Sequence, residues 1–100
     1  NEVVRGESLS LISPVIDVKT APSYFEWREL GQDVEYKIFI YNTKLLWTAT
    51  TKESRIAVPD DVKKMLVPGY KYAWQVRAFS PKGALIAVSS RVQFEIKGNE

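Results

Sequence analysis

Hydrophobic side chains recur at every second position in several short segments of the chain, most regularly between residues 70 and 79. The residues that fall on one side of an extended backbone there are Tyr72, Trp74, Val76 and Ala78. A period of two is that of a β-strand that buries one of its faces. The preceding Pro68-Gly69 pair is a turn signal. We therefore expect residues 70–79 to form an inner strand of a sandwich of two sheets.

The same alternation, interrupted by turn residues, predicts the other strands. In residues 35–41 it places Phe39 and Tyr41 opposite an inward set formed by Tyr36, Ile38 and Ile40. The Thr-rich segment 45–51 is expected to form a hairpin with it, but its pattern does not say which side Trp47 takes. The pattern gives about seven strands in all: 9–18 split at Pro14, 24–28 with Phe25 and Trp27 on one face, 35–41, 45–51, 55–58, 70–79, and 85–97 with a bend at Ser89-Ser90.

One segment favours a helix. Residues 60–66 begin with Asp60 and Asp61, either of which is a suitable N-cap, and basic residues follow toward the end where the helix dipole favours cations. The pattern as a whole predicts an all-β sandwich of about seven antiparallel strands in two sheets, with one short helical turn before the sixth strand. We expect the domain to span residues 9–97, with residues 1–8 as a tail or linker and residues 98–100 as a C-terminal tail.

In this setting the residues resemble a fibronectin type III domain. The resemblance is carried by Phe25-Glu-Trp27, by Tyr36-Lys-Ile38-Phe-Ile40, and by Leu66-Val-Pro-Gly-Tyr-Lys-Tyr-Ala-Trp-Gln-Val-Arg-Ala78, followed by Gly83, Ser90 and Phe94. It covers residues 12–97. The chain is most similar to the variety found in exported and cell-envelope proteins of bacteria.

The resemblance implies an immunoglobulin-like arrangement of the strands, with Trp27 in the core. It also implies that Tyr72 is a corner tyrosine, whose hydroxyl bonds back to the backbone near Leu66 and ties the crossover between the sheets. A location outside the cytoplasm, in the periplasm, the cell envelope or the medium, follows from the resemblance alone. The adhesive tripeptide Arg-Gly-Asp of some family members is absent, and Arg5-Gly6-Glu7 does not replace it.

Composition narrows the range of partners. The 100 residues carry a formal net charge of +2, with acidic and basic residues interspersed, so no concentrated basic patch indicates binding to nucleic acid. Apolar runs such as residues 85–88 are too short to span a membrane. No cysteine is present, which excludes disulfides. Because the chain starts at Asn1, we expect that a leader has been removed or that this is a segment of a longer protein.

The residue types that most catalysis needs are missing. The chain has no His and no Cys, and so lacks the usual base near neutral pH, the strongest nucleophile and the two main zinc ligands. The adjacent carboxylates Asp60-Asp61 are interpreted as a helix start or solvated surface, and no Asp-x-Asp-x-Asp-Gly spacing indicates a calcium loop. We expect no enzyme activity, no cofactor and no metal site.

The outward positions of three strands carry the candidate binding site. It consists of Phe39 and Tyr41 on one strand, Arg77 and Phe79 on its expected neighbour, and Trp47 on the hairpin partner, which form one patch if these strands adjoin, as the family topology implies. Aromatic residues and Arg are enriched in protein interfaces. The expected occupant is a protein partner, a neighbouring domain or a second copy of the chain. In the alternative interpretation, Lys37 and Arg77 merely stack on the rings, or a neighbouring domain, a long loop or a dimer mate covers them.

Two functions of different classes follow. The first is a non-enzymatic structural or protein-interaction module of an exported or cell-envelope protein, which uses the aromatic outer face for assembly. The second is a carbohydrate-binding module, in which sugar rings stack on Trp47 together with Tyr41 or Tyr24. An enzyme would instead need two carboxylates that face each other across a cleft.

Overall fold

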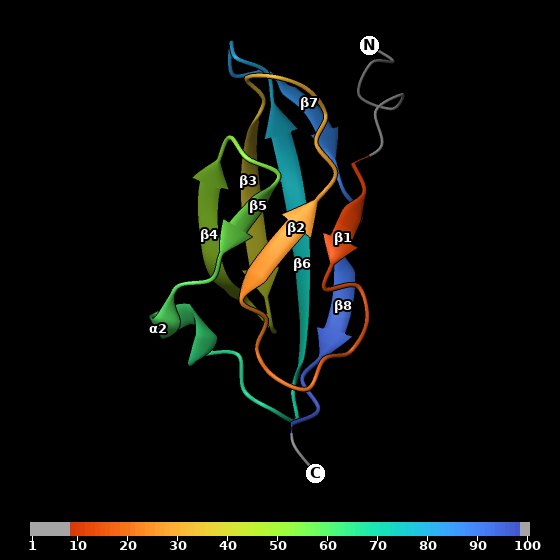
Figure 1. Ribbon diagram of the computed structural model, residues 1–100, viewed down its shortest axis with the longest axis vertical. Helices are drawn as coiled ribbons and strands as arrows, with labels where there is room; N and C mark the ends of the chain where they lie inside the picture. Colours follow the sequence, from red (N-terminus) through yellow and green to blue (C-terminus); the bar gives the residue numbers. More distant parts are fainter. Residues whose placement is uncertain (1–8, 99–100) are drawn as a thin grey trace.

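The computed structural model describes residues 9–98, which form two antiparallel β-sheets packed face to face (Figure 1). The predicted β-sandwich is therefore confirmed. Its elements in chain order are β1 (Leu11–Ser13), β2 (Tyr24–Trp27), β3 (Glu35–Tyr41), β4 (Leu45–Thr51), β5 (Arg55–Ala57), α2 (Asp60–Lys63), β6 (Lys71–Phe79), β7 (Leu85–Val88) and β8 (Val92–Glu95). The predicted tail 1–8 and residues 99–100 lie outside the described residues.

The two sheets differ in size. Strands β1, β2 and β5 form a three-stranded sheet in the order β1-β2-β5. The five-stranded sheet has the order β4-β3-β6-β7, and β8 also pairs with β6. Strand β6 is the longest, with nine residues, and runs through the middle of the molecule (Figure 1). It therefore connects most of the larger sheet.

The last predicted strand, residues 85–97, is divided into β7 and β8, with the expected bend at Ser89-Ser90. Both halves pair with β6. Ser89 lies at the break and is 3% exposed. Its hydroxyl accepts a hydrogen bond from the Val76 N–H (2.9 Å) and donates one to the Ser90 carbonyl (2.8 Å). A side chain thus satisfies a backbone donor at the point where the strand bends.

The core lies between the sheets and contains the inward side chains predicted for it. The five largest fully buried residues are Trp27, Trp74, Tyr36, Phe25 and Phe94. The ring of Phe25 meets that of Trp74 edge to face, with centroids 4.8 Å apart. The Trp74 Nε1 donates a hydrogen bond to the Pro14 carbonyl at 2.8 Å, which joins β6 to the segment after β1.

Tyr72 makes the contacts that the resemblance implied for it. Its hydroxyl accepts a hydrogen bond from the Val67 N–H (3.0 Å) and donates one to the Met65 carbonyl (3.1 Å), on either side of Leu66. Its ring packs against that of Phe94. The crossover from α2 to β6 is therefore fixed to the core at one point.

The first predicted strand is shorter than expected. Of residues 9–18 only β1 is a continuous strand, with isolated parallel bridges at Leu9 and Val18 on either side. Pro14 directly follows β1 and has no N–H to donate, so the ladder ends there.

The helix also departs from its prediction. It ends at Lys63 rather than at residue 66, and its N-cap is Pro59, without a side-chain hydrogen bond. The prediction that Asp60 or Asp61 caps the helix was therefore wrong, because both already belong to its first turn. Their charges there still match the helix dipole. No helix within residues 9–98 is long and apolar enough to cross a membrane.

Candidate functional site

The outer face of the five-stranded sheet brings most of the predicted site together. Strand β3 lies between β4 and β6, with Lys37 opposite Arg77 and Glu35 opposite Phe79. Directly opposed residues in an antiparallel pair point to the same face. The predicted adjacency of the three strands is thus confirmed, and Phe39, Tyr41, Arg77 and Phe79 share the outer face.

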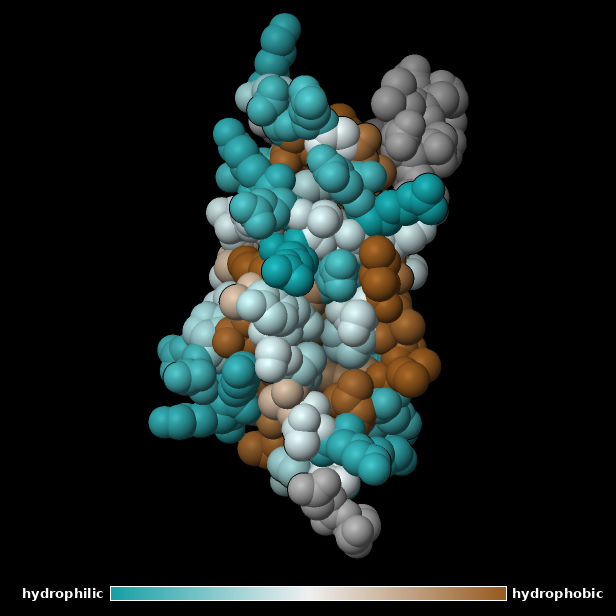
Figure 2. Space-filling model, viewed as in Figure 1, coloured by the Kyte–Doolittle hydropathy of each residue, from teal (hydrophilic) through white to brown (hydrophobic). Residues whose placement is uncertain are grey.

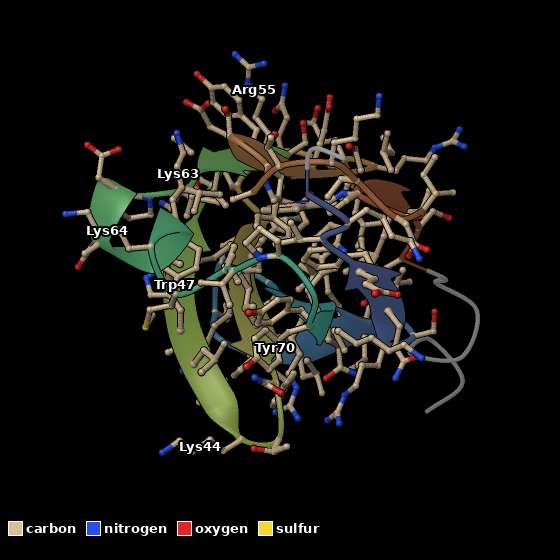
Figure 3. The ribbon with its side chains drawn as sticks, turned by 90° about the horizontal axis from the view of Figure 1, so that it is seen from below. Lys44, Trp47, Arg55, Lys63, Lys64 and Tyr70 are labelled. Atoms are coloured by element: carbon tan, nitrogen blue, oxygen red, sulfur yellow. The ribbon has the colours of Figure 1, made fainter. Side chains whose placement is uncertain are left out.

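Trp47 does not belong to this face. It lies opposite the buried Ile40 and packs, half-buried, against the core. Figure 3 shows it on the side of β4 that is turned toward α2. The placement of Trp47 in the outer patch was therefore wrong, and the inward orientation that the sequence left open is the one observed. The cause is a register irregularity next to Ile40, where Tyr41 pairs with Leu45.

On the outer face, cations are held over aromatic rings. The Arg77 Cζ lies 5.0 Å and the Lys37 Nζ 5.6 Å from the ring centroid of Phe39, and the Arg91 Cζ lies 4.1 Å from that of Tyr41. The two rings are stacked, with centroids 6.4 Å and planes 14° apart. We name this set the cation–aromatic cluster: Lys37, Phe39, Tyr41, Arg77 and Arg91.

The contacts within the cluster favour the observed positions of its side chains. A cation–π contact at an exposed site contributes about 0.5–1 kcal/mol, and each ring here has at least one. Stacking of Lys37 and Arg77 on the rings, considered above as an alternative, is therefore real. A guanidinium that lies flat over a ring keeps the N–H groups at its edge available for hydrogen bonds.

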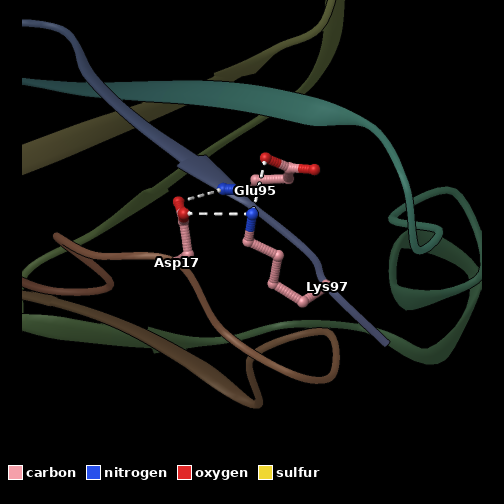
Figure 4. Close-up of polar contacts among 3 residues, drawn as sticks. All are labelled: Asp17, Glu95 and Lys97. Atoms are coloured by element: carbon pink, nitrogen blue, oxygen red, sulfur yellow. Dashed lines mark hydrogen bonds and ion pairs between the residues drawn. The ribbon is translucent and has the colours of Figure 1, made fainter. Parts of the chain in front are cut away.

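Carboxylates do not neutralise these cations within the part of the chain that the structure describes. The ion pairs of residues 9–98 both involve Lys97, whose Nζ lies 3.2 Å from Glu95 Oε1 and 3.8 Å from Asp17 Oδ2 (Figure 4). Lys37, Arg77 and Arg91 form none among those residues. The cluster is therefore a locally positive face built on aromatic supports.

Phe79 lies on the same face but outside the cluster. It ends β6, where it pairs with Glu35 on one side and Leu85 on the other. It is half-buried, and in residues 9–98 its ring makes no aromatic or cation–π contact.

Arg91, in contrast, was missed by the sequence analysis although it belongs to the cluster.

A small hollow lies at the margin of β8. It is about 260 Å³ in volume and is lined by Asp17, Lys71, Gln93, Phe94 and Glu95. Pockets for small molecules usually measure about 300–1,000 Å³. Its acid Asp17 already accepts a hydrogen bond from the Glu95 N–H at 2.9 Å (Figure 4). We therefore interpret the hollow as the space left where the segment before β2 meets β8, and not as a ligand site.

The other acidic residues that the structure describes do not form a cluster suited to metal binding. Asp60 and Asp61 are exposed in the first turn of α2. Within residues 9–98 no three acidic side chains lie together in a way that could hold a metal ion.

The opposite side of the molecule offers a different surface. Figure 2, viewed from the side of the three-stranded sheet, shows apolar side chains gathered along the margin near β1. The exposed residues there are Ile12, Val15 and Ile16, the last of them 72% exposed. Next to β2, the Arg55 Cζ lies 4.7 Å from the ring centroid of Tyr24. A single cation–aromatic pair thus exists on this side as well.

Comparisons of the chain with protein-family models, with curated proteins and with solved structures found no match.

Proposed function

We propose that the protein is a non-enzymatic interaction module of the fibronectin type III kind, which binds a protein partner through the outer face of its five-stranded sheet. The observation that carries the proposal is the cation–aromatic cluster, which is centred on strands β3 and β6 and includes Arg91 from the residue before β8. Arg and aromatic side chains dominate the binding energy of protein interfaces. Here they are combined on one face of a sheet.

Preorganisation of the cluster supports this function. Each side chain that is immobilised on binding costs about 0.5–1.5 kcal/mol. Stacking already restrains Arg77 and Arg91 before a partner arrives. A partner therefore meets guanidinium groups that are already held near the rings, and less conformational freedom is lost on binding.

The test compares two equivalent pairs on opposite sides of the sandwich. The double variant Phe39→Ala/Arg77→Ala removes the centre of the cluster, and Tyr24→Ala/Arg55→Ala removes the cation–aromatic pair of the other sheet. Immobilised wild type and variants would be exposed to an envelope extract, and retained proteins identified by mass spectrometry. We expect the first variant to lose the specific partner and the second to keep it. Equal retention by all three proteins would contradict the proposal.

A carbohydrate-binding role has less support from the geometry. Sugar rings stack on a free aromatic face, but Trp47 packs against the core. Phe39 and Tyr41 stack on each other and carry cations, and Arg55 covers the ring of Tyr24. A ligand sugar would have to displace one of these contacts.

The proposed setting of the module is extracytoplasmic, in the periplasm, the cell envelope or the medium, and follows from the resemblance alone. In that setting the partner is a second envelope protein or a neighbouring domain of the same chain.

A further inference from the structure

The edges of the two sheets are not equally protected. Unpaired edge strands expose backbone N–H and C=O groups, and natural proteins limit this with short strands, charges, proline or bulges. Strands β1 and β5 have three residues each. At the far margin of the larger sheet, β7 and β8 have four residues each and are separated by a bend. Each of these edges is short or interrupted.

Strand β4 is different. It has seven residues, Leu-Leu-Trp-Thr-Ala-Thr-Thr, with no charge and no proline. Within residues 9–98 it pairs with β3 alone, so its other edge is open. Its register is irregular only near its beginning and is continuous from Trp47 to Thr51. Figure 3 shows the strand at the margin of the molecule, with Lys44 at one end. Its backbone groups require another strand, or water, as partner.

We propose that β4 pairs antiparallel with β4 of a second copy of this chain, around a two-fold axis at Thr48. The two five-stranded sheets would then form one continuous sheet across the dimer. Such an interface is isologous, because each residue meets its counterpart in the same register.

The side chains of β4 are self-complementary in this register. On the outer face Thr48 meets the partner's Thr48, and paired threonines are favourable cross-strand neighbours. On the inner face, Trp47 and Ala49 both pack against the core. The register places Trp47 opposite the partner's Ala49, twice by symmetry. A large side chain thus faces a small one, and the half-buried indole gains cover.

Charges mark the two ends of the ladder. Lys44 and Lys52 directly flank the uncharged strand. The same register brings each Lys44 opposite the partner's Lys52, and like charges in that position are unfavourable. These two end pairs weaken the proposed dimer and disfavour pairing beyond the uncharged residues of β4.

The dimer has a consequence for the binding face. A two-fold axis perpendicular to a sheet keeps the outer faces of both halves on the same side. Strand β3 and its copy would be separated by three strand spacings, or about 14 Å. Two cation–aromatic clusters would then be presented side by side, and a partner with two matching sites gains avidity without new contacts.

Three variants of the full chain test the pairing by sedimentation velocity over a range of concentrations. The first variant, Thr48→Lys, places two lysines opposite each other at the axis. The second, Thr50→Lys, instead places a lysine two residues further along the same exposed edge of each copy. Each is expected to raise the dimer Kd at least ~10-fold. Lys52→Glu replaces the like-charged end pairs by opposite charges and is expected to lower the Kd severalfold. Circular dichroism would check that each variant is folded.

Matched controls separate this proposal from its alternatives. Ser90→Lys adds a lysine at the opposite margin of the sheet, and Lys82→Glu makes the same charge change in the exposed β6–β7 turn; neither should alter the Kd. A wild type that stays monomeric up to about 1 mM would overturn the proposal, since Kd = 1 mM corresponds to only about −4 kcal/mol. A dimer that ignores the β4 variants would place the contact elsewhere and overturn it equally. Phe39→Ala/Arg77→Ala should leave the dimer intact, so failure of partner binding and failure of dimerisation are distinguishable.

Discussion

The indole nitrogen atoms of Trp27 and Trp74 lie in the same core but have different surroundings. Trp74 Nε1 donates to the Pro14 carbonyl at 2.8 Å. Trp27 Nε1 is the buried side-chain polar atom that has no hydrogen-bond partner within residues 9–98. A buried donor without a partner costs about 1–3 kcal/mol. Both tryptophans are therefore buried, but the polar atom of Trp74 has a hydrogen-bond partner and that of Trp27 lowers stability because it has none.

This difference gives a matched pair of substitutions. Trp27→Phe and Trp74→Phe remove the same volume, but the first also removes an unsatisfied donor and the second leaves the Pro14 carbonyl without its donor. We expect Trp74→Phe to lower the free energy of unfolding by about 1–3 kcal/mol more than Trp27→Phe. Urea denaturation of both variants measures it. Equal losses, or a larger loss for Trp27→Phe, would show that packing alone governs both sites.

At the scale of elements, one hydroxyl satisfies a buried backbone donor at the point where the last strand is divided. Ser89→Ala removes the acceptor of the Val76 N–H in a buried position. We expect the free energy of unfolding to fall by about 1–3 kcal/mol. The neighbouring Ser90→Ala, at an exposed position, serves as control and should change it by less than about 0.5 kcal/mol. Chemical denaturation is the measurement, and an equal effect of both substitutions would refute this role of Ser89.

Alternation predicted the strands whose two faces differ in chemistry. In β3 and β6 every second residue is apolar or aromatic, so the inward and outward sets followed from the sequence with their correct sides. The outward placement of Phe39, Tyr41, Arg77 and Phe79 could therefore be inferred before the structure. The binding role of these residues remains a proposal.

In strand β4, by contrast, alternation did not predict which face each side chain occupies. Its apolar residues are clustered at one end rather than alternating, and one extra residue at a bulge moves every following side chain to the other face. The irregularity between Ile40 and Tyr41 has no mark in the sequence, so the side taken by Trp47 did not follow. The break at Pro14, in contrast, could be predicted from the sequence, because β1 ends directly before this proline.

Arg91 was missed for a related reason. The alternation of residues 91–96 puts it on the outward side, but its contact with Tyr41 also requires the register in which Val92 lies opposite Trp74. That register depends on the break between β7 and β8. The alternation of residues along one strand thus predicts which face a side chain occupies. Which other side chains it contacts depends on how strands distant in the sequence pair.

At the scale of the whole molecule, the two sheets share one core. Trp27 belongs to the smaller sheet and Trp74 to the larger, and their rings are 6.3 Å apart. Neither sheet can separate without exposing both indoles. We expect a single cooperative unfolding transition in urea, with coincident curves from tryptophan fluorescence and far-ultraviolet circular dichroism. Retention of the β-sheet signal after the fluorescence has changed would contradict a shared core.

The first and last described segments run side by side in the same direction. Leu9 bridges Ser89 and Val18 bridges Ile96, both in parallel, and the Lys97 N–H donates to the Val18 carbonyl at 2.7 Å. The described part of the chain begins in the upper part of Figure 1 and ends at the bottom, so its two ends are separated along the 47 Å long axis. Tension applied between these two points pulls the segments past each other and loads their hydrogen bonds together, in shear, rather than opening them one at a time. The contacts of the two segments would therefore resist such a pull together.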